Sequence, residues 1–380
     1  MARALSFSTR LSASFGLVGV VLATPWSTQA QAQETALQEQ TIARAREILA
    51  PWIEEYPGLA VAVTHGDSIV WTAGFGMANL EAGTPATPTT RFNVYSVAKM
   101  LTGVAAARLA QEGHLDLDQP VREILLDLPD HYGDVTSRQL VSHLGGVRHY
   151  GRGGDWGRFG AMHCREPADA VRHFVRRPLV GPPGEQRHYS TYGFVLLSAV
   201  IGARSPQGSY LQYMTEAVFE PAGMVDTRLD TADSPSSDEA VPYRREDDGF
   251  EPIPDIDASC KFGGGGFLSS ALDLARFGRA LYSGALLAPE WLEVATTSAT
   301  LPGGETTYYA FGADANTSDI SGQSVRWVRH SGGSPGGRGY VVVLLSEDLA
   351  VGMAGNLEGE GLRLAATGLA YLFAGLEPSR

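Results

Sequence analysis

Apolar residues follow two different periods along this chain, and the change between them separates helical from β-rich parts. Apolar positions recur at helical spacing over residues 34–53, which predicts an amphipathic helix. Two short apolar runs follow at 59–64 and 69–75, and the turn-forming residues 65–68 join them. We therefore expect a helix and then a β-hairpin at the start of the folded domain.

The central part of the chain is predicted to be mostly helical. An Ala- and Leu-rich stretch from 100 to 112 is followed by Gly113, a typical helix C-cap. Polar pairs three residues apart predict three further helix N-termini, at Thr136 with Gln139, Ser209 with Gln212, and Ser270 with Asp273. Helices are also expected at 166–177 and 194–201, whereas the acidic, Pro-rich residues 231–256 predict a long surface loop.

Strand-like runs return near the C-terminus, at 325–330, 340–346 and 349–354, and a helix is expected at 361–373. The connections between these runs are short, which predicts an antiparallel meander. The N-terminal hairpin can complete the same sheet, so that the two ends of the chain share one layer. The residues between them, from about 96 to 230, are then expected to form a helical lobe.

The first residues have the pattern of a secretory signal. Arg3 and Arg10 precede an apolar run at 11–23, and small residues occupy Ala30 and Ala32. This pattern predicts a signal peptide over residues 1–32 and a mature domain over 33–376, periplasmic or secreted, with no stable membrane span after cleavage. The apolar run is short for a permanent transmembrane helix. A retained N-terminal anchor is the alternative.

Composition narrows the classes of partner. The chain has 380 residues, 44% of them hydrophobic, which is ordinary for a globular protein with a sizeable core. Its formal net charge of −13 argues against binding to nucleic acid or to anionic lipid. The two cysteines, Cys164 and Cys260, make no disulfide framework, and the sequence leaves open whether they pair.

Ser96 and Lys99 are the first candidate catalytic residues. Their spacing puts both side chains on one face of the helix expected to begin there. The chain has only two lysines, Lys99 and Lys261, although it has 29 Lys and Arg residues together. Burial lowers the pKa of a lysine far enough to make it a base for a serine hydroxyl. The alternative is a helix-capping serine beside a solvated lysine.

Two further motifs follow in order, and with them a family resemblance appears. They are Tyr189-x-Thr191 and His330-Ser331-Gly332, the second on an expected strand. With Ser96-x-x-Lys99, the chain resembles the serine β-lactamase-related hydrolases, which include class C β-lactamases, D-alanyl-D-alanine carboxypeptidases and esterases. Residues 140–150, 189–193 and 264–269 resemble the LACTB-like serine protease branch more closely.

The resemblance implies a fold and a set of roles. The fold would be an α/β sandwich of the β-lactamase/transpeptidase type, with a five-stranded antiparallel sheet flanked by helices. Ser96 would be the nucleophile, and Lys99 and Tyr189 would share the proton transfers. The backbone N–H groups of Ser96 and Gly333 would form the oxyanion hole. Thr191, His330, Ser331 and Gly332 would line the substrate side, with a small molecule or peptide as substrate.

Three chemical questions remain open at this point. Tyr189 acts as a base only if a neighbouring cation such as Lys99 lowers its pKa, so either residue is a candidate base. His143 and His149 suggest a metal site, but no H-E-x-x-H pattern supports one, and no cofactor is expected. Thr191 stands where the family usually has Asn, and His330, only partly charged near neutral pH, stands where it usually has Lys.

Both replacements lower the expectation of efficient β-lactam hydrolysis. The leading hypothesis is an exported serine hydrolase that cleaves an amide or ester through a Ser96 acyl-enzyme, with peptidase- or esterase-like specificity. One alternative is a true β-lactamase or D-alanyl-D-alanine carboxypeptidase. Another is a non-catalytic protein that binds peptidoglycan or serves as a scaffold.

Overall fold

We analysed a computed structural model of the chain, which describes residues 25–151, 162–231, 236–253, 257–359 and 361–376. The chain divides into two units, residues 1–43 and 44–380. Helix α1 (Pro25–Glu55) begins in the first unit, and residues 1–24 of the expected signal peptide lie outside the described residues. No helix among the described residues is both long and apolar enough to cross a membrane.

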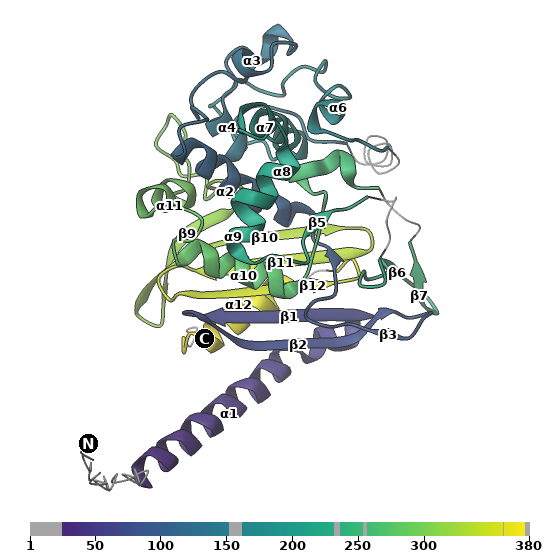
Figure 1. The fold of residues 1–380 in the computed structure, drawn as a ribbon, viewed down its shortest axis with the longest axis vertical. Coiled ribbons are helices and arrows are strands. Elements are labelled where there is room, and N and C mark those ends of the chain that lie inside the picture. The colour runs from purple at the N-terminus through teal and green to yellow at the C-terminus, as the bar shows by residue number, and fades with distance from the viewer. Residues whose placement is uncertain (1–24, 152–161, 232–235, 254–256, 360, 377–380) are drawn as a thin grey trace, which may run out of the picture. The chain divides into compact units, whose positions relative to one another are not determined.

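The second unit is built on an antiparallel sheet, which has seven strands in the described residues (Figure 1). Their order across the sheet is β3-β2-β1-β12-β11-β10-β9. Their bounds are β1 (Gly58–His65), β2 (Ser68–Asn79), β3 (Thr84–Pro85), β9 (Asp314–Ile320), β10 (Gln323–Ser334), β11 (Gly337–Leu344) and β12 (Leu349–Gly355).

The expected five strands form the centre of this sheet, and one strand is added at each edge. β3 has only two residues, and β9 is polar along most of its length, so neither has a clear apolar pattern. β1 pairs with β12, with Leu59 opposite Gly355, which joins the two ends of the unit in one layer as predicted.

Helices cover both faces of the central strands. Gly278 of α10 (Ala271–Tyr282) lies directly against Ala350 of β12 on one face. On the other face, Phe373 of α12 (Leu362–Phe373) stacks on Trp71 of β2. Because both faces are covered, β1, β11 and β12 are almost wholly buried, which explains their continuous apolar runs.

The helical lobe surrounds two buried helices, α2 (Ala98–Gln111) and α7 (Thr191–Arg204). The remaining described helices of the lobe are α3 (Val121–Ile124), α4 (Ser137–Val141), α6 (Pro167–Val171), α8 (Tyr210–Met214) and α9 (Glu220–Ala222), and α11 (Pro289–Thr296) packs on α2. All three expected N-caps are confirmed, and Thr136 with Gln139 forms a full capping box.

Two local expectations are wrong. The helix expected at 166–177 ends at Val171. Beyond it, the Phe174 N–H donates a hydrogen bond to the Val171 carbonyl, an i to i−3 bond that is tighter than a helical one. The loop expected at 231–256 contains a hairpin of β6 (Tyr243–Glu246) and β7 (Gly249–Pro252). Most side chains of this hairpin are exposed, so no apolar alternation marks it in the sequence.

Candidate active site

Ser96 lies in a short 3₁₀ turn, Tyr95–Val97, that leads directly into α2. The turn follows β4 (Phe92–Asn93), which pairs with β8 (Phe267–Ser269), and β8 also pairs with β5 (Arg228–Leu229). Tyr95 has a positive φ of 44°, a conformation that costs a non-glycine residue roughly 1–3 kcal/mol. Its hydroxyl donates a 2.8 Å hydrogen bond to the Pro335 carbonyl, which ties the turn to the end of β10.

Lys99 is fully buried, and three polar atoms surround its amine. Nζ lies 3.0 Å from Ser96 Oγ, 3.1 Å from Thr191 Oγ1 and 2.5 Å from the Gly264 carbonyl oxygen. Burial, and secondarily the charge of Lys261, hold the pKa of Lys99 well below its usual value. A neutral amine fits this environment, since its two N–H groups and one lone pair match the three neighbours.

Tyr189 approaches the serine with its hydroxyl. The phenol oxygen lies 2.9 Å from Ser96 Oγ, while the side chain as a whole is 37% exposed. Burial raises the pKa of Tyr189 above its usual value, and the hydrogen bond with Ser96 only partly opposes the rise. The charge of Lys99 is not among the causes of this shift, so the condition set for Tyr189 as a base is not met here.

Two histidines hold the second motif in place. The Nδ1 atom of His143 accepts a 3.2 Å hydrogen bond from the Ser190 N–H, and Nδ1 of His149 accepts one of the same length from the Thr191 N–H. The His143 ring also packs on the Tyr189 ring, with centroids 4.4 Å apart. His143 adopts a positive φ of 62° to reach this position.

These contacts give both histidines positioning roles that the sequence did not identify. Burial, with the charge of Lys99 as a smaller cause, lowers the pKa of His149 to about 4, and that of His143 also lies well below its usual value. Among the described residues, no cluster of three or more His, Cys, Asp or Glu side chains is arranged to hold a metal ion.

Strand β10 brings the third motif against Ser96. A Cβ atom at Gly332 would lie 1.8 Å from the Val94 carbonyl oxygen and 2.8 Å from the Ser96 nitrogen, so glycine permits this close approach. β9 pairs with β10 only from Gln323 to Arg329. Within the described part of the chain, the edge of β10 from His330 onward has no strand beside it on that side.

His330 does not present a titrating charge to the cleft. Only 6% of the residue is exposed, its Nε2 lies 3.1 Å from the Tyr309 hydroxyl, and its Nδ1 lies 2.6 Å from the Ser331 carbonyl oxygen. Burial, with the charge of Lys99 as a smaller cause, lowers the pKa of His330 to about 3. Burial therefore favours a neutral imidazole over the partial charge expected of this residue near neutral pH.

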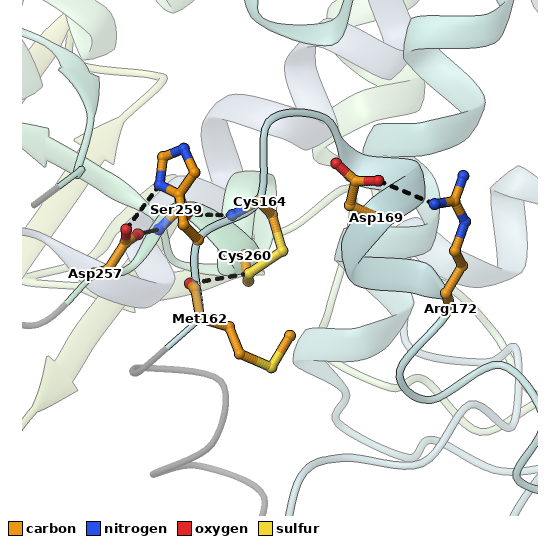
Figure 2. The surroundings of a disulfide bond; sticks show 8 residues. Met162, Cys164, Asp169, Arg172, Asp257, Ser259 and Cys260 are labelled. Carbon is orange, nitrogen blue, oxygen red and sulfur yellow. Dashed lines mark hydrogen bonds and ion pairs between the residues drawn. A yellow bond between two sulfur atoms is a disulfide. The ribbon is translucent and has the colours of Figure 1, made fainter. Parts of the chain in front are cut away.

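The segment that supplies the Gly264 carbonyl is joined to the rest of the lobe by a disulfide. Cys164 and Cys260 are bonded, with Cα atoms 4.9 Å apart, which answers the question that the sequence left open (Figure 2). Cys164 also donates its backbone N–H to Ser259 Oγ at 3.0 Å. Cys260, Lys261 and Gly264 all belong to the helical segment Ser259–Gly264.

The second lysine of the chain is buried behind the nucleophile turn. The Nζ atom of Lys261 lies 5.3 Å from the centre of the Tyr95 ring. Burial lowers the pKa of Lys261 to about 8, although the charge of Asp230 opposes the shift. Burial likewise raises the pKa of Asp230 to about 7, against the charge of Lys261 and a hydrogen bond from Asn93.

The site and the fold can now be compared with known proteins. The sequence profile of the family described as Beta-lactamase matches residues 40–374. The chain is 29% identical to the human "Serine beta-lactamase-like protein LACTB, mitochondrial" over 336 residues, covering 68% of this chain and 60% of that protein. It is also 29% identical to "Penicillin-binding protein 4*" of Bacillus subtilis (strain 168), over 74% of this chain and 64% of that protein.

Solved structures of similar fold include proteins related to these relatives. The octameric penicillin-binding protein homologue from Pyrococcus abyssi superimposes with a TM-score of 0.74 at 26% identity, covering 89% of this chain and 77% of that one. A class C β-lactamase superimposes with a TM-score of 0.73 at 18% identity, which supports the fold alone. The chain spans about three-fifths of the length of the human and Bacillus subtilis relatives. On the match that covers residues 40–374, this chain belongs to the beta-lactamase family.

Proposed function

We propose that this protein is a serine hydrolase that cleaves an amide or ester bond through an acyl-enzyme on Ser96. One observation carries the proposal: Ser96 Oγ lies within hydrogen-bond distance of both the Lys99 amine and the Tyr189 hydroxyl. A nucleophile, a base and a second proton carrier therefore meet at one atom.

In the acylation step, Lys99 acts as the general base. Its neutral amine takes the Ser96 proton while Oγ attacks the carbonyl carbon of the substrate. The backbone N–H groups of Ser96 and Gly333 are proposed to receive the negative charge on the carbonyl oxygen. A single donor of this kind typically contributes about 10²–10³-fold to the rate. Thr191 and the Gly264 carbonyl keep the amine oriented toward Oγ.

In the second half of acylation, the leaving group needs a proton. Tyr189 is neutral, and its hydroxyl already contacts Oγ, so it can donate its proton to the leaving nitrogen or oxygen while Lys99 returns one to Tyr189. A water molecule then attacks the carbonyl carbon of the acyl-enzyme, and Lys99 or Tyr189 accepts its proton. As the bond from that carbon to Ser96 Oγ breaks, the proton passes to Oγ. Ser96 and the free acid are released.

The edge of β10 supports an extended acyl chain as substrate. In the described part of the chain, no strand pairs with this edge from His330 onward, and Ser331 is exposed there. An amide or ester chain laid along this edge pairs with backbone groups in the manner of an added strand. This favours peptidase- or esterase-like specificity. A true β-lactamase or D-alanyl-D-alanine carboxypeptidase remains the second candidate, favoured by the family and by the name of the penicillin-binding relative.

Export to the periplasm or beyond is part of the same proposal. It depends on the signal pattern at 1–32, and a buried disulfide is consistent with an oxidising compartment. N-terminal sequencing of protein recovered from the periplasm or medium tests it, with Gln33 as the expected first residue. An intact Met1 in the recovered protein would contradict it.

Parallel incubation with a short-chain ester, a peptide amide and a penicillin, followed by intact-mass analysis, tests the reaction class. We expect ester turnover and only slow or undetectable penicillin turnover. Ser96→Ala should abolish turnover, whereas Ser324→Ala, an exposed serine on β10 away from Ser96, should leave it unchanged. Efficient penicillin turnover would favour the β-lactamase candidate. Equal activity in wild type and Ser96→Ala would exclude the proposed mechanism.

A further inference from the structure

Arg187 lies beside the proposed catalytic residues, two positions before Tyr189. Its side chain is exposed, and its Cζ atom lies 4.6 Å from the centre of the Tyr309 ring. Tyr309 is buried, and its hydroxyl lies 3.1 Å from Nε2 of His330. The Tyr309 ring therefore lies between the Arg187 guanidinium and His330 of the third motif. The same ring holds the guanidinium by a cation–π contact.

Three other groups near Ser96 that could carry a positive charge are buried. Lys99 and His330 are buried, with pKa values below their usual range, and His143 is buried with its pKa lowered as well. Arg187, by contrast, is exposed and offers the N–H donors of a guanidinium. The chain as a whole has a net charge of −13, so a local cation favours the approach of an anionic group to the site.

The charge of Arg187 reaches the reaction centre and is not neutralised by a close partner. Burial is the main cause of the shifted pKa values of Tyr189, His143 and His330, and the charge of Arg187 is a smaller cause in all three. Among the described residues, Arg187 forms no ion pair within 4.0 Å.

The charge of Arg187 also acts on the carboxyl group of Asp314, on strand β9. Burial raises the pKa of Asp314, while the charges of Arg329 and Arg187 oppose the rise. No ion pair within 4.0 Å joins Asp314 to Arg187 among the described residues, so the guanidinium fork can face a ligand. The planar fork of a guanidinium matches the two oxygens of a carboxylate.

We propose that Arg187 binds a carboxylate of the substrate at the mouth of the cleft, and so makes the enzyme selective for anionic esters or amides. This inference rests on the proposed hydrolase function. It assigns the recognition of the substrate's negative charge to a residue outside the three sequence motifs. Tyr309 serves as the platform that holds the guanidinium in place.

The first test measures binding, without turnover, in the Ser96→Ala protein. Three phenyl esters of similar size are titrated calorimetrically: one with a carboxylate on the acyl side, one with a carboxylate on the leaving group, and one neutral. We expect at least one anionic ester to bind about tenfold more weakly when Arg187→Gln is added, and the neutral ester to be unaffected. Arg187→Lys should recover part of the loss. The ester that responds identifies the side of the scissile bond on which the carboxylate lies.

The second test measures kcat/KM for the same esters in proteins that retain Ser96. Arg187→Gln should lower kcat/KM for the responding anionic ester about tenfold, mainly through KM, with the neutral ester little changed. Arg244→Gln, an exposed arginine of the β6–β7 hairpin, is the matched control and should change neither. Equal losses for anionic and neutral esters, or affinities that do not depend on Arg187, would overturn the inference. Arg187-dependent binding without any turnover would instead reject the hydrolase proposal and keep the carboxylate site.

Discussion

The Nζ atom of Lys99 lies 3.0 Å from Oγ of Ser96. Lys99 belongs to helix α2, which is buried almost from end to end. Removing a lysine from water disfavours its charged form, and Thr191 and Gly264 accept hydrogen bonds that a neutral amine can still donate. The fold therefore places a buried amine beside a hydroxyl at the start of a helix. That relationship, more than the motif spacing alone, supports the proposed chemistry.

The pH dependence of activity should follow the protonation of Lys99. The base works only when neutral, so kcat/KM for a neutral ester should fall as the pH drops through the folded-state pKa of Lys99. Because burial lowers that pKa, activity should persist well below pH 10.5, the ordinary value for a lysine. Lys99→Ala should cost roughly 10³-fold in kcat. A pH–rate profile that rises only near pH 10 would contradict the neutral-amine assignment.

His330 should contribute no pH dependence near neutrality. Its pKa is lowered to about 3, so it stays uncharged from about pH 5 upward. The ratio of kcat/KM for an anionic ester to that for a neutral ester should be flat between pH 5.5 and 8, measured in one enzyme preparation. A ratio that falls through pH 6.5 would restore the charged role first considered for His330.

The sequence predicted the central architecture because that part of the fold follows from periodicity and capping. Strands buried on both faces produce continuous apolar runs, as at Leu59, and Ser or Thr caps mark helix starts, as at Thr136. β9 is polar because it lies at an edge of the large sheet, and the β6–β7 hairpin forms a separate two-stranded sheet whose side chains are mostly exposed. Those elements carry no apolar signal to detect.

Part of the site could be predicted from the sequence. Ser96, Lys99 and Tyr189 were named from motifs, and the structure brings them within hydrogen-bond distance. The positioning role of His143 depends on a left-handed backbone conformation, and the exposure of Arg187 depends on the packing of Tyr309. Contacts between residues so far apart in sequence depend on the tertiary structure.

Gly332 should not tolerate a side chain. A Cβ atom there would overlap the Val94 carbonyl and crowd the Ser96 nitrogen, both of them backbone groups that cannot rotate away. Gly332→Ala should reduce kcat/KM by at least 10²-fold and destabilise the protein by about 1–3 kcal/mol, read from urea unfolding. Gly303→Ala is the control, because nothing lies within 4 Å of the new methyl group. Wild-type activity in Gly332→Ala would disprove the close approach of β10 to Ser96.

The disulfide should stabilise the fold. Cys164 and Cys260 are 96 residues apart, and a loop of that size corresponds to about 4–5 kcal/mol in the chain-entropy account. Replacing both cysteines with serine should lower the free energy of unfolding by roughly this amount under oxidising conditions. A reducing agent should destabilise the wild type but not the double variant. If both proteins unfold at the same urea concentration under oxidising conditions, the bond contributes nothing to stability.

The covalent intermediate on Ser96 is the most direct test of the central claim. The protein is mixed with an activated ester, quenched in acid within milliseconds to seconds, digested and mapped by mass spectrometry. The account predicts one acyl adduct, located on Ser96 in the peptide that contains residues 92–99, and absent from Ser96→Ala. An adduct on another residue, or an adduct that persists in Ser96→Ala, would contradict it.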